Sequence, residues 1–102
     1  MANLNMSKAF THQQAKIIAS IVSNYSYPFL AFGSRVKGVH KEYSDLDLCY
    51  RADIPDLVIA QLKDDFEQSD LPFKVDIVAW KRCSPEFQQM IDRDLVPLDT
   101  LL

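Results

Sequence analysis

Two acids in one strand-like run are the residues of this sequence best placed to do chemistry. Asp45 and Asp47 are two positions apart in a stretch whose residues alternate as a β-strand does. Successive strand side chains point to opposite faces, so both carboxylates lie on one face, roughly 6–7 Å apart along the strand. Mg²⁺ prefers carboxylate oxygens combined with substrate phosphates. The pair therefore predicts a divalent-cation site, and the alternative is a solvated strand face that carries two charges.

The turn before these acids holds the only two glycines of the sequence, Gly33 and Gly38. Glycine is used where a backbone must turn sharply or approach a ligand closely. Ser34, Arg35 and Lys37 lie between the glycines, and small donors, backbone N–H groups and cations suit an anionic phosphate group. The spacing fits neither the P-loop pattern nor Gly-x-Gly-x-x-Gly. The turn is therefore predicted to bind phosphate in another way.

A third acid, Asp76, lies in a later apolar run, Val75-Asp76-Ile77-Val78. An acid in the middle of an apolar strand is costly unless it has partners. One interpretation is an edge strand with a solvated carboxylate. The other is that Asp76 joins Asp45 and Asp47 in one site.

Three motifs occur in a fixed order: Gly33-Ser34-Arg35-x-x-Gly38, Ser44-Asp45-Leu46-Asp47-Leu48 and Val75-Asp76-Ile77-Val78. With them the chain resembles the minimal nucleotidyltransferases, small relatives of the DNA polymerase beta-like superfamily, over about residues 29–80. The resemblance implies that three acids are catalytic and bind Mg²⁺ or Mn²⁺, namely Asp45, Asp47 and Asp76. It also implies that ATP is the substrate and that its phosphates contact the turn, which comprises Gly33, Ser34, Arg35, Lys37 and Gly38.

Hydrophobic periodicity predicts the elements that must position these residues. Helices are expected at about 12–24, from a start at Asp53 to about residue 68, and after Ser84, with strands at about 29–32, 45–51 and 73–80. This order predicts an α/β (α+β) domain with a small mixed sheet, helices on one face and the acids on the other. The resemblance implies the polymerase-beta-like nucleotidyltransferase fold. The aliphatic residues 94–102 are expected to fold back as an edge element or to dock on another subunit.

Composition narrows the class of protein. With 102 residues we expect a single domain, 1–102, and the net charge of −3 argues against direct nucleic-acid binding, which favours a basic stripe. The sequence shows no apolar run of membrane-spanning length and no signal pattern, and its two cysteines are too few for a disulfide framework. We expect a cytoplasmic protein that does not bind membranes.

The resemblance also implies a partner, because larger relatives carry a further domain that holds the base and the acceptor. The usual companion of such small proteins is an all-helical HEPN-type protein encoded nearby, in a hetero-oligomer that forms a toxin–antitoxin module. The implied function is Mg²⁺-dependent transfer of AMP from ATP to a hydroxyl of that partner. The alternatives are a small-molecule, aminoglycoside-type nucleotidyltransferase with a separate substrate-binding subunit, and a masking antitoxin without catalysis. The intact set of three acids argues against the last.

Overall fold

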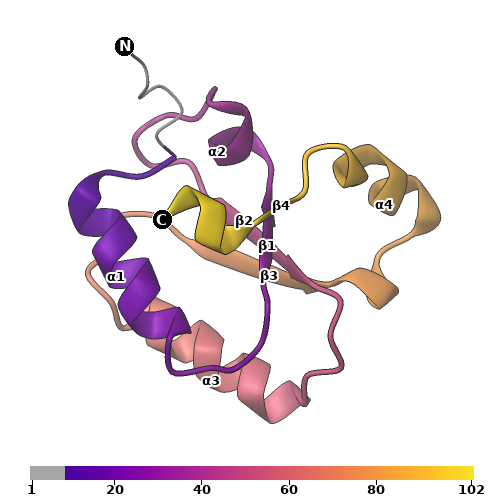
Figure 1. Cartoon of the computed structure of the whole chain (residues 1–102), viewed down its shortest axis with the longest axis horizontal. Helices are drawn as coiled ribbons and strands as arrows, with labels where there is room; N and C mark the ends of the chain where they lie inside the picture. The colour runs from indigo at the N-terminus through magenta and orange to yellow at the C-terminus, as the bar shows by residue number, and fades with distance from the viewer. Residues whose placement is uncertain (1–8) are drawn as a thin grey trace.

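A four-stranded mixed sheet is the centre of the computed structural model, which describes residues 9–102 (Figure 1). Its order is β3-β2-β1-β4. β2 and β3 run parallel, whereas β1 is antiparallel to both of its neighbours. The predicted mixed α/β architecture is therefore confirmed. The strands are β1 (Leu30–Phe32), β2 (Leu46–Tyr50), β3 (Val75–Ala79) and β4 (Val96–Pro97).

The three predicted helices lie close to their predicted positions, and a fourth, short helix forms in the segment predicted as a turn. Thr11 caps the first of them in a capping box with Gln14, and Ser84 caps the last, as their sequence patterns indicate. The helix predicted from Asp53 begins three residues later, at Asp56, because a proline disfavours helical backbone at the residue before it, and here that proline is Pro55. The α-helices are α1 (His12–Val22), α2 (Ser34–Lys37), α3 (Asp56–Glu67) and α4 (Pro85–Asp92), and short 3-10 helices cover Trp80–Arg82 and Leu98–Leu101.

The main hydrophobic core lies between the sheet and the pair α1 and α3. Ile18 of α1 and Leu62 of α3 are fully buried there. Leu46 and Leu48 of β2 and Ile77 of β3 supply the strand side of the same cluster. Burial of these apolar side chains is the main force that holds the helical layer on the sheet.

The second face of the sheet is divided between an apolar end and an acidic end. Phe87 and Ile91 of α4 pack on Phe32 and Cys49, so α4 covers the apolar end, where the sequence analysis expected no helix. The reason is strand alternation: Cys49 lies on the same face as Asp47 but two positions farther along β2, where the neighbouring side chains are apolar. The acidic end lies outside this second cluster.

The C-terminal segment folds back onto the sheet as an edge element, which is the first of the two predicted alternatives for residues 94–102. β4 pairs with β1, and the N–H of Leu98 donates to the carbonyl of Phe29 at 2.9 Å. Leu98 itself is only 2% exposed, so this segment completes the core. Within residues 9–102, no helix combines the length and apolar character needed to cross a bilayer.

Candidate active site

The sheet register brings two of the three acids face to face. Because β2 and β3 are parallel, Asp47 lies directly opposite Asp76 on the neighbouring strand. Because β1 is antiparallel to β2, Phe32 lies opposite Asp47 on the other side. The glycine turn follows Phe32 directly, so the turn and the acids meet at one end of the sheet, as the sequence predicts.

Asp47 is the least exposed of the three acids. It is half-buried, whereas Asp45 and Asp76 are exposed. Burial raises the pKa of Asp47, and the nearby charges of Asp76 and Asp45 raise it further. Each of these effects disfavours the ionised carboxylate. A cation placed among the three carboxylates would reverse the repulsion.

Gly33 brings the backbone of the turn against this carboxylate. Its φ of 88° and ψ of −161° belong to a region that is essentially restricted to glycine. A Cβ atom at Gly33 would lie 2.5 Å from Oδ2 of Asp47, closer than real Cβ contacts. The close approach that the sequence predicts at Gly33 is therefore present, and Asp47 is the group approached.

The rest of the turn forms the short helix α2. Ser34 begins it, half-buried, and Gly38 ends it in the left-handed conformation with φ 76°. The N–H of Gly38 donates to the carbonyl of Ser34. Lys37 forms an ion pair with Asp94 at 3.5 Å, so the structure directs this cation toward the segment after α4. Of the two glycines in the turn, Gly33 lies against a catalytic candidate.

Arg35 is buried and contacts the backbone of neighbouring segments. It is only 2% exposed, and its guanidinium donates to the carbonyls of Ser44, Ala9 and Glu42 at 2.9, 2.7 and 3.1 Å. The guanidinium also lies 3.8 Å from the ring centroid of Phe73. Three N–H groups of Arg35 thus donate to backbone carbonyls, so this side chain holds the loop that leads to the acids, and its contact with a phosphate stays a prediction.

A cleft of about 660 Å³ opens beside Asp45 and Asp76. Sequence analysis missed three polar residues in its lining: Tyr43, Lys63 and Lys74. Lys74 could have been found, because it lies two positions before Asp76 and so shares its strand face. Lys63 carries no such signal, since in the sequence it is one of several charges on the wet side of a helix. Phe66, Glu67, Leu71, Pro72, Phe73 and Val75 complete the lining.

The donor set fits a hard divalent cation. Asp45, Asp47 and Asp76 offer carboxylate oxygens alone, and the charges of Asp76 and Asp45 that act on Asp47 would be offset by a cation placed among them. Within residues 9–102, however, no group of three His, Cys, Asp or Glu side chains is arranged closely enough to hold a metal ion. The metal-binding role of the three acids therefore stays a prediction.

Comparison with known proteins identifies the family to which the chain belongs. The model of the family described as "Polymerase beta, Nucleotidyltransferase" matches residues 12–98. A protein of Haemophilus influenzae, "Probable protein adenylyltransferase MntA", is 43% identical over 77 residues, which are 74% of this chain and 66% of that protein. The match thus spans just under two thirds of the relative's length.

The fold also matches a solved structure described as "Crystal structure of the toxin-antitoxin with AMP-PNP". The TM-score is 0.62 at 20% sequence identity, over 82% of this chain and 71% of the other. This likeness supports the fold, and the family match covers most of the chain, including every motif that carries the acids and the turn. The chain belongs to the polymerase beta nucleotidyltransferase family.

Proposed function

We propose that this chain transfers AMP from ATP to a hydroxyl group of a partner protein. The observation that carries the proposal is the register of Asp47 opposite Asp76, with the backbone of Gly33 closed against the Asp47 carboxylate. Three carboxylates beside a glycine turn suit a nucleoside triphosphate with its divalent cation. The 43% identical relative named as a probable protein adenylyltransferase supports a protein acceptor.

Each residue of the site has a role in this proposal. Asp45, Asp47 and Asp76 would hold Mg²⁺ or Mn²⁺, which when bound supplies positive charge at the α-phosphate. Ser34 and backbone N–H groups of the turn would orient the β- and γ-phosphates. The acceptor oxygen forms a bond to the α-phosphorus, the bond from that phosphorus to the bridging oxygen breaks, and pyrophosphate leaves. Asp76, exposed at the cleft, takes the hydroxyl proton.

We propose further that the chain is the antitoxin of a pair and that its partner is an all-helical HEPN-type protein encoded nearby. Support comes from the fold match to a structure described as a toxin–antitoxin. In this proposal the two proteins form a hetero-oligomer in the cytoplasm. AMP transfer to the partner would then silence it.

Intact-mass spectrometry tests the transfer. The chain and the protein encoded beside it are purified together and incubated with ATP and Mg²⁺, and the expected product is an adenylyl increment on the partner. The Asp45→Asn variant should produce none, whereas Asp70→Asn, the same charge change at an exposed residue of the α3–β3 loop, should act as the unchanged chain does. A neutralised partner of unchanged mass would instead identify a masking antitoxin. Modification of a small hydroxylated acceptor alone would identify a small-molecule enzyme.

Calorimetry tests the site without the partner. ATP should bind more tightly in the presence of Mg²⁺, because the cation links the phosphates to the carboxylates. The gain should disappear in the double variant Asp45→Asn/Asp47→Asn. Equal ATP affinity with and without Mg²⁺ would contradict the proposed site.

A further inference from the structure

The sheet has an open edge at β3. β3 is the last strand on its side of the order β3-β2-β1-β4, and it is five residues long. The opposite edge, β4, has two residues and contains Pro97, which cannot donate a backbone hydrogen bond. The two edges therefore differ: within residues 9–102, β3 is the edge strand that is long enough and free of proline for another strand to pair with it.

The backbone direction of β3 follows from its ladder with β2. The N–H of Leu46 donates to the carbonyl of Lys74 at 2.9 Å. In a parallel ladder, every second residue of a strand directs both its N–H and its C=O to the same neighbouring strand. Asp76, two positions after Lys74, therefore also bonds to β2. Val75 and Ile77 then direct their N–H and C=O groups away from β2. Within residues 9–102, these outward groups of Val75 and Ile77 have no hydrogen-bond partner.

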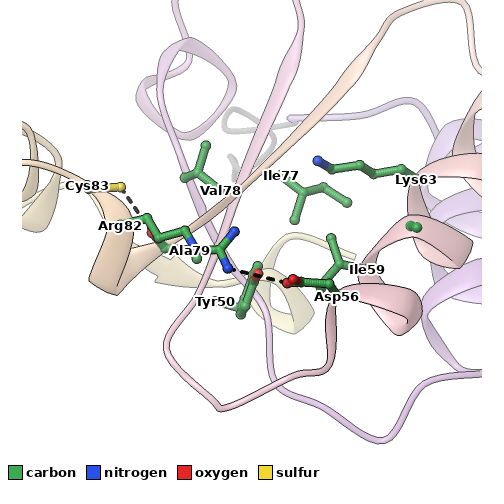
Figure 2. Close-up of a pocket in the computed structure, with 10 residues that line it drawn as sticks. Tyr50, Asp56, Ile59, Lys63, Ile77, Val78, Ala79, Arg82 and Cys83 are labelled. Atoms are coloured by element: carbon green, nitrogen blue, oxygen red, sulfur yellow. Dashed lines mark hydrogen bonds and ion pairs between the residues drawn. The ribbon is translucent and has the colours of Figure 1, made fainter.

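Two clefts lie along this edge, one at each half of β3. The first, about 430 Å³, lies between α3 and residues 77–79, and Figure 2 shows Ile59 and Lys63 reaching into it from α3. The ion pair between Arg82 and Asp56, at 3.5 Å, closes its far side. The second is the 660 Å³ cleft at residues 74–76. Lys63 lines both clefts, and its amine points toward Ile77 in Figure 2.

We propose that the acceptor hydroxyl reaches the site on an extended segment of the partner protein, which pairs with the open edge of β3. The inference rests on the proposed function and specifies how the acceptor is held. Across the sheet, the glycine turn lies on the β1 side of Asp47, and Asp76 with the second cleft lies on the β3 side. A triphosphate bound at the turn would therefore not occupy the β3 side of Asp47, and the acceptor can approach the site from that side.

The geometry of an added strand predicts a sequence pattern for the segment. The residue opposite Asp76 projects on the open face, so it must carry the hydroxyl. Its two neighbours project toward α3, into clefts where they can contact the apolar side chains Ile59 and Phe66 beside Lys63. The segment should read apolar–hydroxyl–apolar. The positions just beyond this triplet project on the open face again, where an acidic residue would complement Lys74, which forms no ion pair within residues 9–102.

Nuclear magnetic resonance of the ¹⁵N-labelled chain with two blocked heptapeptides tests the docking directly. The first peptide has a central tyrosine, leucine on each side of it, and glutamate at the next positions. The matched peptide exchanges the leucines and glutamates, which reverses the two faces of the segment. The first should shift the amide signals of Val75 and Ile77 and slow their exchange by about tenfold or more, since these groups become hydrogen-bonded. The matched peptide should bind at least about tenfold more weakly, because its leucines would be exposed on the open face and its glutamates would replace them against Ile59 and Phe66.

A pair of variants tests the backbone contact itself. Val75→Pro removes one outward N–H at the first residue of β3, a position where a strand tolerates proline. Peptide affinity should fall at least about tenfold. Val75→Thr keeps the N–H and should bind nearly as the original chain does. Retained protection of the Asp76 amide, which bonds toward β2, would show that the sheet remains folded.

The outcomes separate this inference from the proposed function. Equal binding of the two peptides, or signal changes confined to residues away from β3, would overturn the edge-pairing inference. AMP transfer by the intact complex without protection of Val75 and Ile77 would overturn the inference alone. Edge binding without AMP transfer by the complex would refute the proposed function, and with it the acceptor role of the edge.

Discussion

Replacing Gly33 with alanine should damage the site more than replacing Gly38, although both glycines have positive φ. The backbone of Gly33 lies in the glycine-only region, so an alanine there costs about 3 kcal/mol in conformational strain. The added Cβ also meets the Asp47 carboxylate at 2.5 Å and must displace it. At Gly38 the conformation is ordinary left-handed, which costs about 1 kcal/mol, and a Cβ has no neighbour within 4 Å.

Thermal unfolding followed by circular dichroism measures the difference. For a domain of this size each kcal/mol shifts the Tm by roughly 4–8 °C, so Gly38→Ala should lower the Tm by about that much. Gly33→Ala should lower it by roughly 12–24 °C. It should also weaken Mg²⁺-dependent ATP binding in calorimetry, whereas Gly38→Ala should retain the metal dependence.

A double-mutant cycle isolates the contact with the carboxylate. In an Asp47→Ala background the Cβ of Gly33→Ala no longer meets Oδ2, so only the conformational strain should remain. Gly33→Ala should therefore cost measurably less in that background. If the two glycine substitutions destabilise equally, or if the cost of Gly33→Ala is the same in both backgrounds, the reasoning about the close approach is refuted.

Three further predictions concern single side chains. The pKa of Asp47 is raised in the folded state, so the stability of the fold falls as the pH rises from the pKa of Asp47 in the unfolded chain through its pKa in the folded chain. Asp47→Asn should therefore raise the Tm at pH 7 and lose that advantage near pH 3. The same difference in Tm at both pH values would contradict this. Arg35→Leu leaves three backbone carbonyls without donors and should lower the free energy of unfolding in urea by about 3 kcal/mol, with little recovery in Arg35→Lys, because one ammonium cannot span all three carbonyls. Burial and a hydrogen bond to Asp65 raise the pKa of Tyr25 to about 12, so ultraviolet absorbance should show a phenol that ionises near pH 12 and titrates lower in Asp65→Asn.

Sequence patterns predicted the local structure well where local physics decides it. The capping box of Thr11 and Gln14 and the Ser84-Pro85 helix start involve groups within four residues of one another, and both occur in the structure. The common location of the three acids followed from motif order. Their register did not, because the pairing of Asp47 with Asp76 depends on how α3 returns the chain to the sheet.

Two features were beyond sequence reasoning for the same reason. A cation between two glycines looks like an anion ligand, and only the fold shows that Arg35 turns toward Phe73 and distant carbonyls. The apolar side of α4 was visible in the sequence, but the sheet face that it covers depends on the path of residues 80–84. In both cases tertiary contacts override a local pattern.

The hydrogen bond from Arg35 to Ala9 couples the glycine turn to a segment that is far from it and from the acids in the sequence. Phe10 adds to this link, since its ring stacks on Phe73 with centroids 6.3 Å apart and lies beside the same guanidinium. Segments that share buried contacts open together as one cooperative unit. Local unfolding at residues 9–10 would therefore release the turn while the sheet stays intact. If the turn binds a nucleotide as proposed, the fraction of molecules competent to bind it depends in part on how stably residues 9–10 stay packed against Arg35 and Phe73.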